Sequence, residues 1–145
     1  MKSLWILILY GLIGVSFFGC AAGGETTADG QRQEVLSALG DTGKMLKDEN
    51  LSSIRNFFSE DFFGGYDYVE NQILDNWQNQ QLIDLKFTVN RILEKDGIYN
   101  VQTRWHKNYL DASGNPQRAS GLSEILLVPY HGAFKILNIS GDRFF

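Results

Sequence analysis

The chain has 145 residues, enough for one domain, and an ordinary globular composition with 43% hydrophobic and 21% charged residues. Its net charge of −4 and the lack of any basic run argue against nucleic-acid binding, which relies on Lys and Arg to neutralise phosphates. The single cysteine excludes an intramolecular disulfide, and the two histidines have no cysteine partner for a structural zinc site. We therefore expect no metal and no cofactor.

The first residues have the pattern of a secretory signal. Lys2 is followed by an apolar run over Leu4–Phe18 and then by Gly19. A positive start, a short apolar stretch and a small residue before the cleavage point are the parts of such a signal. The run is a little short for a bilayer span, which needs ~20 residues. Residues 1–19 are therefore predicted to be a signal peptide.

The segment Phe17-Phe18-Gly19-Cys20 resembles the lipobox of bacterial lipoproteins, although Phe17 stands where that family usually has Leu. The resemblance implies that the Cys20 thiol receives a lipid, with palmitate among the attached chains, and that residues 20–30 form a flexible tether. Because Ala21 and not Asp follows the cysteine, the family's sorting habit implies the outer membrane, facing the periplasm. An uncleaved helical anchor with an idle Cys20 and simple secretion remain the alternatives.

Three helices are predicted after the tether. An apolar stripe runs over Gln31–Lys47, where Gly40 and Gly43 each weaken the helix by up to about 1 kcal/mol relative to Ala. Asn50 is a candidate N-cap for a second, short helix. A third helix is predicted over roughly Tyr68–Asn79, with its apolar residues on one side.

From Leu82 the hydrophobic period changes from helical spacing to two, which indicates strands with one buried face. Lys95-Asp96-Gly97 and His131-Gly132 predict turns. The four expected strands run from Leu82, over Ile98–Tyr109, over about Ala119–Tyr130 and over Ala133–Ser140. Residues 31–145 are thus predicted to be a single α+β domain, with N-terminal helices packed on one face of a four-stranded antiparallel sheet.

The last two strands are apolar on both faces. One face carries Ile125, Leu127, Phe134 and Ile136, and the other carries Leu126, Val128, Leu137 and Ile139. A sheet with helices on one face should be polar on the other. The second apolar set therefore predicts a cover, which is a partner protomer in a homodimer, another envelope protein or the N-terminal segment.

The order of elements resembles the nuclear transport factor 2-like (SnoaL-like) cone fold, with another cystatin-like sheet as the alternative. The pieces that carry the resemblance are Leu51–Phe62, Tyr99–Trp105 and Phe134–Asp142. Many members end with an aromatic-Lys-Ile strand and a Gly-Asp pair. The resemblance implies a curved sheet and a conical pocket between sheet and helices. Some members are enzymes, such as those of the ketosteroid isomerase type, and others only bind ligands or proteins.

No catalytic residue transfers from this resemblance. An isomerase-like site needs a carboxylate base and a tyrosine in an apolar cavity, but Asp67 and Asp75 are more simply turn or capping acids. His106 alternates with the inward Trp105 and is expected in solvent, and His131 lies at a hairpin tip. Candidates for lining a pocket are Tyr66, Tyr68, Trp77, Tyr99, Trp105, Asn138 and Asp142. Asp142 is alternatively a brace for the C-terminal turn beside Arg143, through a structural ion pair.

The expectation for function follows from the anchor and the lack of a catalytic set. We expect a non-catalytic, lipid-anchored protein of the bacterial envelope that binds a small apolar ligand or a protein partner. The alternative is a SnoaL-like enzyme that acts by proton transfer on a hydrophobic small molecule. A purely structural role in an envelope assembly is a third hypothesis, which the sequence does not separate from the first.

Overall fold

The computed structural model describes residues 28–145, so the predicted signal peptide at residues 1–19, the lipid-attachment residue Cys20 and most of the tether lie outside the described residues. The elements follow in the order α1 (Ala28–Lys47), α2 (Leu51–Phe57), α3 (Tyr66–Asn79), β1 (Gln80–Lys95), β2 (Ile98–Asp111), β3 (Pro116–Tyr130) and β4 (Ala133–Gly141). The α+β prediction is confirmed. Helix α1 starts three residues before the expected boundary, so residues 28–30 are helical rather than part of the tether.

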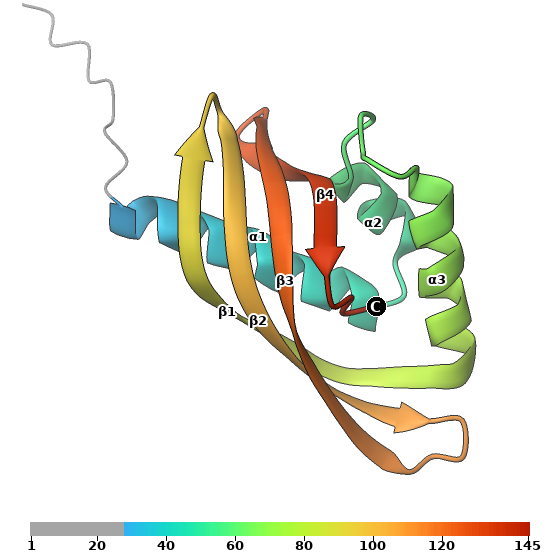
Figure 1. Ribbon diagram of the computed structural model, residues 1–145. Coiled ribbons are helices and arrows are strands. Elements are labelled where there is room, and N and C mark those ends of the chain that lie inside the picture. The colour runs from blue at the N-terminus through green and yellow to red at the C-terminus, as the bar shows by residue number, and fades with distance from the viewer. Residues whose placement is uncertain (1–27) are drawn as a thin grey trace, which may run out of the picture.

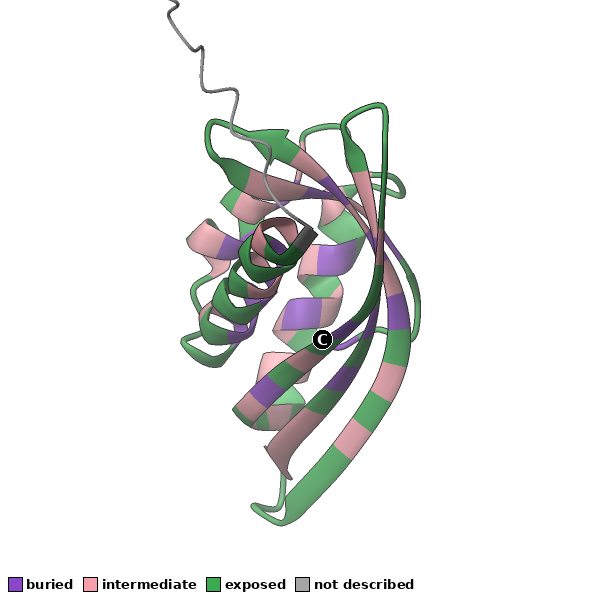
Figure 2. Ribbon diagram, turned by 90° about the vertical axis from the view of Figure 1, so that its left-hand side faces the viewer, coloured by how far each residue is buried: buried purple, intermediate pink, exposed green. Residues whose placement is uncertain are grey.

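The strands form one antiparallel sheet in the order β1-β2-β3-β4. The sheet is strongly curved, and the three helices lie on its concave side (Figures 1 and 2). Both tight turns were predicted correctly. Asp96 and Gly97 have φ of 54° and 78°, and His131 and Gly132 have φ of 49° and 78°. Positive φ at both central residues matches the right-handed twist of the flanking strands, which explains the choice of Gly at the second position.

Helix α1 crosses the concave face and packs mainly against β1. Val35, Leu39 and Leu46 are buried beneath it, and the Thr42 hydroxyl donates to the Ala38 carbonyl at 3.0 Å. Gly43 is also buried, and a Cβ at this position would lie 3.1 Å from the carbonyl oxygen of Leu85. The glycine that weakens the isolated helix thus allows the close approach of helix and sheet.

Helices α2 and α3 complete the layer above the sheet. Asn50 caps α2, where its side chain accepts a hydrogen bond from Ser53 N at 3.0 Å, as predicted. Ile54 of α2 and Val69 and Ile73 of α3 point into the same core as the inner residues of the strands. A short parallel bridge joins Phe58, just after α2, to Ile136 of β4. This bridge ties the helical layer to the edge of the sheet.

A β-bulge in β4 corrects one prediction about the faces of the sheet. Leu126 pairs with Asn138 and Leu127 with Ile136, which leaves Leu137 as an extra residue. The alternation therefore shifts by one residue after Ile136. Ile139 pairs with Ile125 and is 7% exposed, so it belongs to the core and not to the outer face with Leu126.

Candidate functional site

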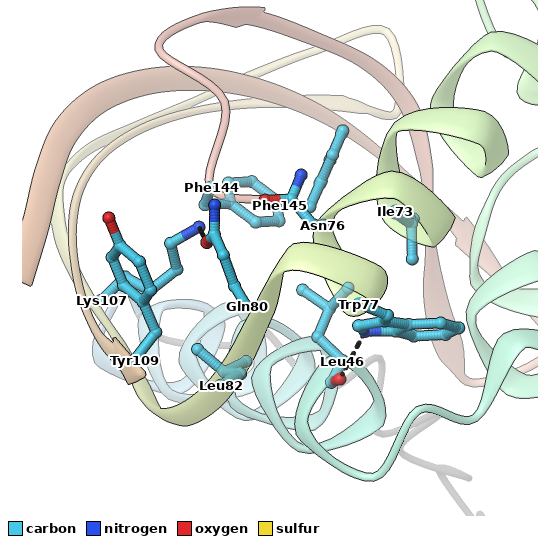
Figure 3. A pocket seen from close by; sticks show the side chains of 10 residues that line it. All are labelled: Leu46, Ile73, Asn76, Trp77, Gln80, Leu82, Lys107, Tyr109, Phe144 and Phe145. Atoms are coloured by element: carbon cyan, nitrogen blue, oxygen red, sulfur yellow. Dashed lines mark hydrogen bonds between the residues drawn. The ribbon is translucent and has the colours of Figure 1, made fainter. Parts of the chain in front are cut away.

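An apolar pocket opens on the concave side of the sheet, where the ends of several elements meet. Its walls come from the end of α1, the second half of α3, the start of β1, the end of β2 and the last two residues (Figure 3). The lining residues are Leu46, Ile73, Asn76, Trp77, Gln80, Leu82, Lys107, Tyr109, Phe144 and Phe145. Of the residues that the sequence nominated for a pocket, this one contains Trp77.

The apolar wall is held in place by contacts between the helices and the C-terminal segment. The Trp77 indole N–H donates to the Leu46 carbonyl at 3.0 Å, which joins α3 to the end of α1. Phe144 is 1% exposed and packs edge-on against Phe87 of β1, with ring centres 5.0 Å apart. Phe145 packs edge-on against Phe144 and is only partly buried. Both aromatic residues therefore dock against the body of the domain.

The pocket contains one charged side chain, Lys107 on β2. Its ammonium donates to Gln80 Oε1 at 3.0 Å and lies 5.0 Å from the centre of the Tyr109 ring. Within residues 28–145 the Lys107 side chain makes no other hydrogen bond and no ion pair. Burial therefore acts without a compensating anion, and it lowers the pKa of Lys107 from its ordinary value.

Lys107 was not predicted as a site residue, although the pattern of the strand contains the signal. Residues Val101, Thr103 and Trp105 are buried at alternate positions of β2, and the next inner positions are Lys107 and Tyr109. Lys107 pairs across the ladder with Leu85, which is itself a core residue. A lysine in an inward-facing row of mostly apolar and aromatic residues departs from the expected pattern of a buried strand face, and this departure marks the site.

The pocket is narrow. The space between its walls, including the open mouth, is about 310 Å³, but the centre of a water molecule fits in only about 20 Å³ of it. The second volume is the one to compare with small-molecule sites of roughly 300–1,000 Å³, and it is room for about one water molecule. A ligand can therefore enter only if a wall residue moves to admit it.

Tyr66 lies apart from this pocket, in a surface hollow of about 320 Å³ between α2 and α3. Its ring packs edge-on against Phe58, and the Arg55 guanidinium lies 5.4 Å above its centre. Burial and then the charge of Glu70 raise the pKa of Tyr66, and Arg55 opposes them. Glu70 is itself paired with Arg55 at 2.5 Å, so the arrangement is a cluster that stabilises the α2–α3 contact.

The remaining pocket candidates are dispersed. Tyr68 is 56% exposed beneath the Arg143 guanidinium, and Tyr99 lines a groove near the tip of the β3–β4 hairpin. Asn138 pairs with Leu126, on the sheet face opposite the helices. Trp105 is 4% exposed and belongs to the core. The structure thus brings none of these four residues into the pocket that contains Trp77.

Asp142 holds the C-terminal turn in place, which was one of the two roles predicted for it. Its carboxylate accepts a hydrogen bond from Leu122 N at 3.0 Å, and its carbonyl accepts the Trp105 indole N–H at 3.1 Å. The predicted ion pair with Arg143 does not form. Arg143 instead donates to Gln72 Oε1 and stacks on Tyr68. The backbone N–H of Asp142 also donates to the Leu122 carbonyl at 2.8 Å, so this residue attaches the C-terminal segment to β3.

The acids and histidines do not form a catalytic set within residues 29–145. Asp67, Asp75 and Asp142 are exposed, and no carboxyl group in this range is buried. His106 is exposed as predicted, and His131 is exposed at the hairpin tip. The described residues contain no cluster of three metal-ligating side chains. None of the helices after residue 27 is long and apolar enough to cross a membrane.

Two adjoining grooves lie between α1, α2 and the β3–β4 hairpin, with free volumes of about 560 and 500 Å³. They share Met45, Phe57, Ala133 and Phe134. The acidic residues of the grooves, Glu34 and Asp41, are exposed, and no buried charged group among the described residues lines either groove.

The proposed partner face lies elsewhere, on the last two strands. Without Ile139 it consists of Leu126, Val128 and Leu137, all half-buried in the single chain.

Comparison with solved structures identifies the architecture. A conserved protein from Planctomyces limnophilus matches with a TM-score of 0.65 at 10% identity, over 79% of this chain and 99% of that one. The protein Aln2 from a Streptomyces species matches with a TM-score of 0.64 at 12% identity, over 81% and 93%. A ketosteroid isomerase-like protein from Erwinia carotovora matches with a TM-score of 0.59 at 11% identity, over 79% and 93%.

At these identities the likeness shows the fold, which is the α+β cone of the nuclear transport factor 2-like type. Three helices pack against a curved, open, four-stranded antiparallel sheet, as the sequence resemblance implied. Comparisons with protein-family models and with curated proteins find no match. The fold hosts both binding proteins and enzymes, so the function has to be argued from the pocket itself.

Proposed function

We propose that this chain is a lipid-anchored protein of the bacterial cell envelope whose domain binds a small apolar molecule without catalysing a reaction on it. The observation that carries the binding role is the pocket between α1, α3 and the first two strands. Its walls are mostly apolar or aromatic, and its few polar groups converge from β1 and β2. This combination is typical of small-molecule sites.

The composition of the pocket favours binding over catalysis. Proton transfer needs a base in reach of the substrate, and carboxylates and histidines serve most often, with lysine and tyrosine as the other choices. The pocket lining contains no carboxylate and no histidine. Its charged group, Lys107, has no acid beside it to accept and return a proton. The exposure of Asp67, Asp75 and Asp142 also supports a non-catalytic role.

Filling the pocket tests the binding role. Asn76 lines the pocket and donates to the Gln72 carbonyl at 2.9 Å, whereas Asn79 makes the equivalent bond to the Asp75 carbonyl at 2.9 Å but lies outside the pocket. We expect Asn76→Phe to abolish binding of the uncharged fluorophore N-phenyl-1-naphthylamine, because the ring occupies the slot. The matched variant Asn79→Phe should bind as the unmodified chain does. Equal binding by both variants would reject the pocket.

The anchor is tested separately. Full-length protein expressed in a bacterial host should fractionate with membranes and incorporate an alkyne-labelled palmitate. Intact mass should correspond to a chain that begins at Cys20 and carries lipid. We expect Cys20→Ala to abolish the label and the membrane fraction, because stable anchoring needs more than one acyl chain. A Cys20→Ala protein that stays in the membrane would indicate an uncleaved helical anchor instead.

A further inference from the structure

We propose that this pocket selects slim apolar molecules that carry a single carboxylate, with the carboxylate bound by the Lys107 ammonium and the apolar body packed against Trp77 and Leu46. The inference rests on the proposed binding function and names its ligand class. It excludes uncharged hydrocarbons and cationic amphiphiles as preferred ligands.

The position of Lys107 is the first observation that carries the proposal. Its side chain belongs to the inner row of β2, in line with Trp105 and Tyr109, and pairs with Leu85 of the core. A residue that served only solubility would stand in the outward row, where Arg104 and His106 are exposed. The strand therefore aims a cation into an otherwise apolar cavity.

The second observation is the unused capacity of the ammonium. Lys107 has three N–H donors, and the described residues accept one of them, at Gln80 Oε1. No carboxylate of residues 28–145 forms an ion pair with it. A half-buried cation without an anion is unfavourable, and a bound carboxylate supplies both the charge and the missing acceptors. The lowered pKa of Lys107 is the expected signature of this unpaired state.

The arrangement of the pocket walls determines where the apolar body of the ligand lies. In Figure 3, Lys107 and Tyr109 lie on one side of the pocket, and Ile73, Trp77 and Leu46 lie on the other. A carboxylate on Lys107 thus directs the attached body along the apolar wall. The free space between these walls holds about one water molecule, so the ligand body enters only when a wall residue moves aside. We expect Phe145 to be the wall residue that moves, because it is partly buried and lies at the end of the described chain.

The experiment measures binding of decanoate, decanol and decylamine to the intact domain by calorimetry, below their aggregation concentrations. We expect decanoate to bind at least tenfold more tightly than decanol, and decylamine to bind more weakly than both. Lys107→Met should lower the affinity for decanoate roughly 10- to 100-fold, as expected for loss of a charge-assisted hydrogen bond, and leave decanol unchanged. Lys107→Arg should retain most of the preference.

The matched control is Lys86→Met, because Lys86 lies on the same sheet but is exposed and paired with Asp84 at 3.2 Å. This variant should bind decanoate normally. Equal affinities for decanoate and decanol would overturn the carboxylate proposal but leave the binding function intact. If none of the three compounds binds and the uncharged fluorophore does not bind either, the binding function itself is rejected. A decanoate preference that survives Lys107→Met would also overturn the proposal.

A pH series gives an independent readout. The ligand binds only to the protonated ammonium, and the other titratable side chain that lines the pocket is Tyr109. We expect decanoate affinity to fall as pH rises through the lowered pKa of Lys107, and decanol affinity to stay constant over the same range. In Tyr109→Phe the same fall should persist. A flat profile for decanoate would show that Lys107 does not hold the carboxylate.

Discussion

Lys107 is a residue whose charge opposes folding. Burial disfavours the ammonium, so the pKa of Lys107 is lower in the folded chain than its ordinary value of 10.5. Between these two pKa values the unfolded chain binds more protons than the folded one, and stability rises with pH across that window. Below the folded pKa the full penalty is present. The position of Lys107 therefore costs stability, and binding of the proposed carboxylate would offset that cost.

This penalty makes a prediction about stability without ligand. We expect Lys107→Met to raise the melting temperature at pH 7, because Met fills the same space without a charge to desolvate. The gain should shrink as pH approaches 10.5, where Lys107 loses its proton in the unfolded chain as well. Thermal unfolding of both chains at pH 7 and at a pH near 10.5 checks both parts. A Lys107→Met chain that is less stable at pH 7 would show that the Gln80 bond outweighs desolvation.

Gly121 explains why Trp105 is a core residue rather than a pocket residue. The two residues face each other across β2 and β3, and a Cβ on Gly121 would lie 2.5 Å from Trp105 Cζ2 and 2.5 Å from Asp142 Cβ. Such distances are too short for real atoms, so the indole lies directly over the glycine backbone. The absence of a side chain at Gly121 therefore makes room for both Trp105 and the Asp142 brace.

We expect Gly121→Ala to reduce the free energy of unfolding by about 1–3 kcal/mol, the usual effect of overpacking. Trp105 or the C-terminal segment must move to admit the methyl group. Ser120→Ala on the same strand is the control, since Ser120 is exposed and should change stability by less than about 0.5 kcal/mol. Chemical denaturation measures both. Equal effects of the two substitutions would contradict the close contact.

At the scale of the element, α1 shows that tertiary contacts change the effect of a glycine on stability. Gly40 and Gly43 both weaken the helix in isolation. In the structure a Cβ on Gly40 meets nothing within 4 Å, whereas a Cβ on Gly43 would lie 3.1 Å from the Leu85 carbonyl oxygen. The sequence predicted the helix despite both residues, and only the fold distinguishes their roles.

We expect Gly40→Ala to raise the free energy of unfolding by about 0.5–1 kcal/mol, because alanine reduces the entropy that the backbone loses on folding. Gly43→Ala should fail to gain this and should lie below Gly40→Ala by about 1 kcal/mol or more, since α1 or β1 must give way. Thermal unfolding of the two single variants decides the matter. Two equal increases would mean that α1 does not press on β1.

The strands illustrate the limit of reading faces from alternation. The pattern placed Ile125 and Leu127 correctly in the core, because β3 is regular at those positions. It failed for Ile139, because the bulge at Leu137 adds one residue to β4. A bulge has no reliable mark in a single sequence. The size of an outer apolar face is therefore overestimated when every alternate residue is counted.

At the scale of the whole molecule, Phe144 joins the last segment to the first strand. It is 1% exposed, packs against Phe87 of β1 and lines the pocket with Phe145. Asp142 attaches the same segment to β3. The end of the described chain is thus part of the core and of the pocket wall, and Figure 1 shows it lying between β4 and the helices.

We expect Phe144→Ala to reduce the free energy of unfolding by about 3–5 kcal/mol, as for other buried phenylalanines. Phe145→Ala should reduce it by clearly less, because Phe145 is only partly buried and solvent can fill the space. Urea unfolding with calorimetric confirmation compares the two variants. A small effect of Phe144→Ala would indicate that the C-terminal segment does not dock in solution.

Local patterns in the sequence were enough to predict the order and type of the elements. Helical spacing up to Asn79, alternation from Leu82 and the Asp-Gly and His-Gly turns are local properties, and backbone sterics act on them residue by residue. These local signals were sufficient for the α+β class and for the Asn50 cap. The lipid anchor at Cys20 rests on the resemblance to a lipobox and stays a prediction, because Cys20 lies outside the described residues.

Which side chains share a cavity depends on the tertiary structure and could not be predicted from local patterns. The seven nominated pocket residues are dispersed, because the curvature of the sheet and its register shifts set where the inner row of each strand ends. Lys107 is recognised as a site residue only in the structure, where β1, β2, α3 and the C-terminal segment surround it. A cavity depends on contacts between residues far apart in the chain and on the volume that they leave, and neither quantity is present in local patterns.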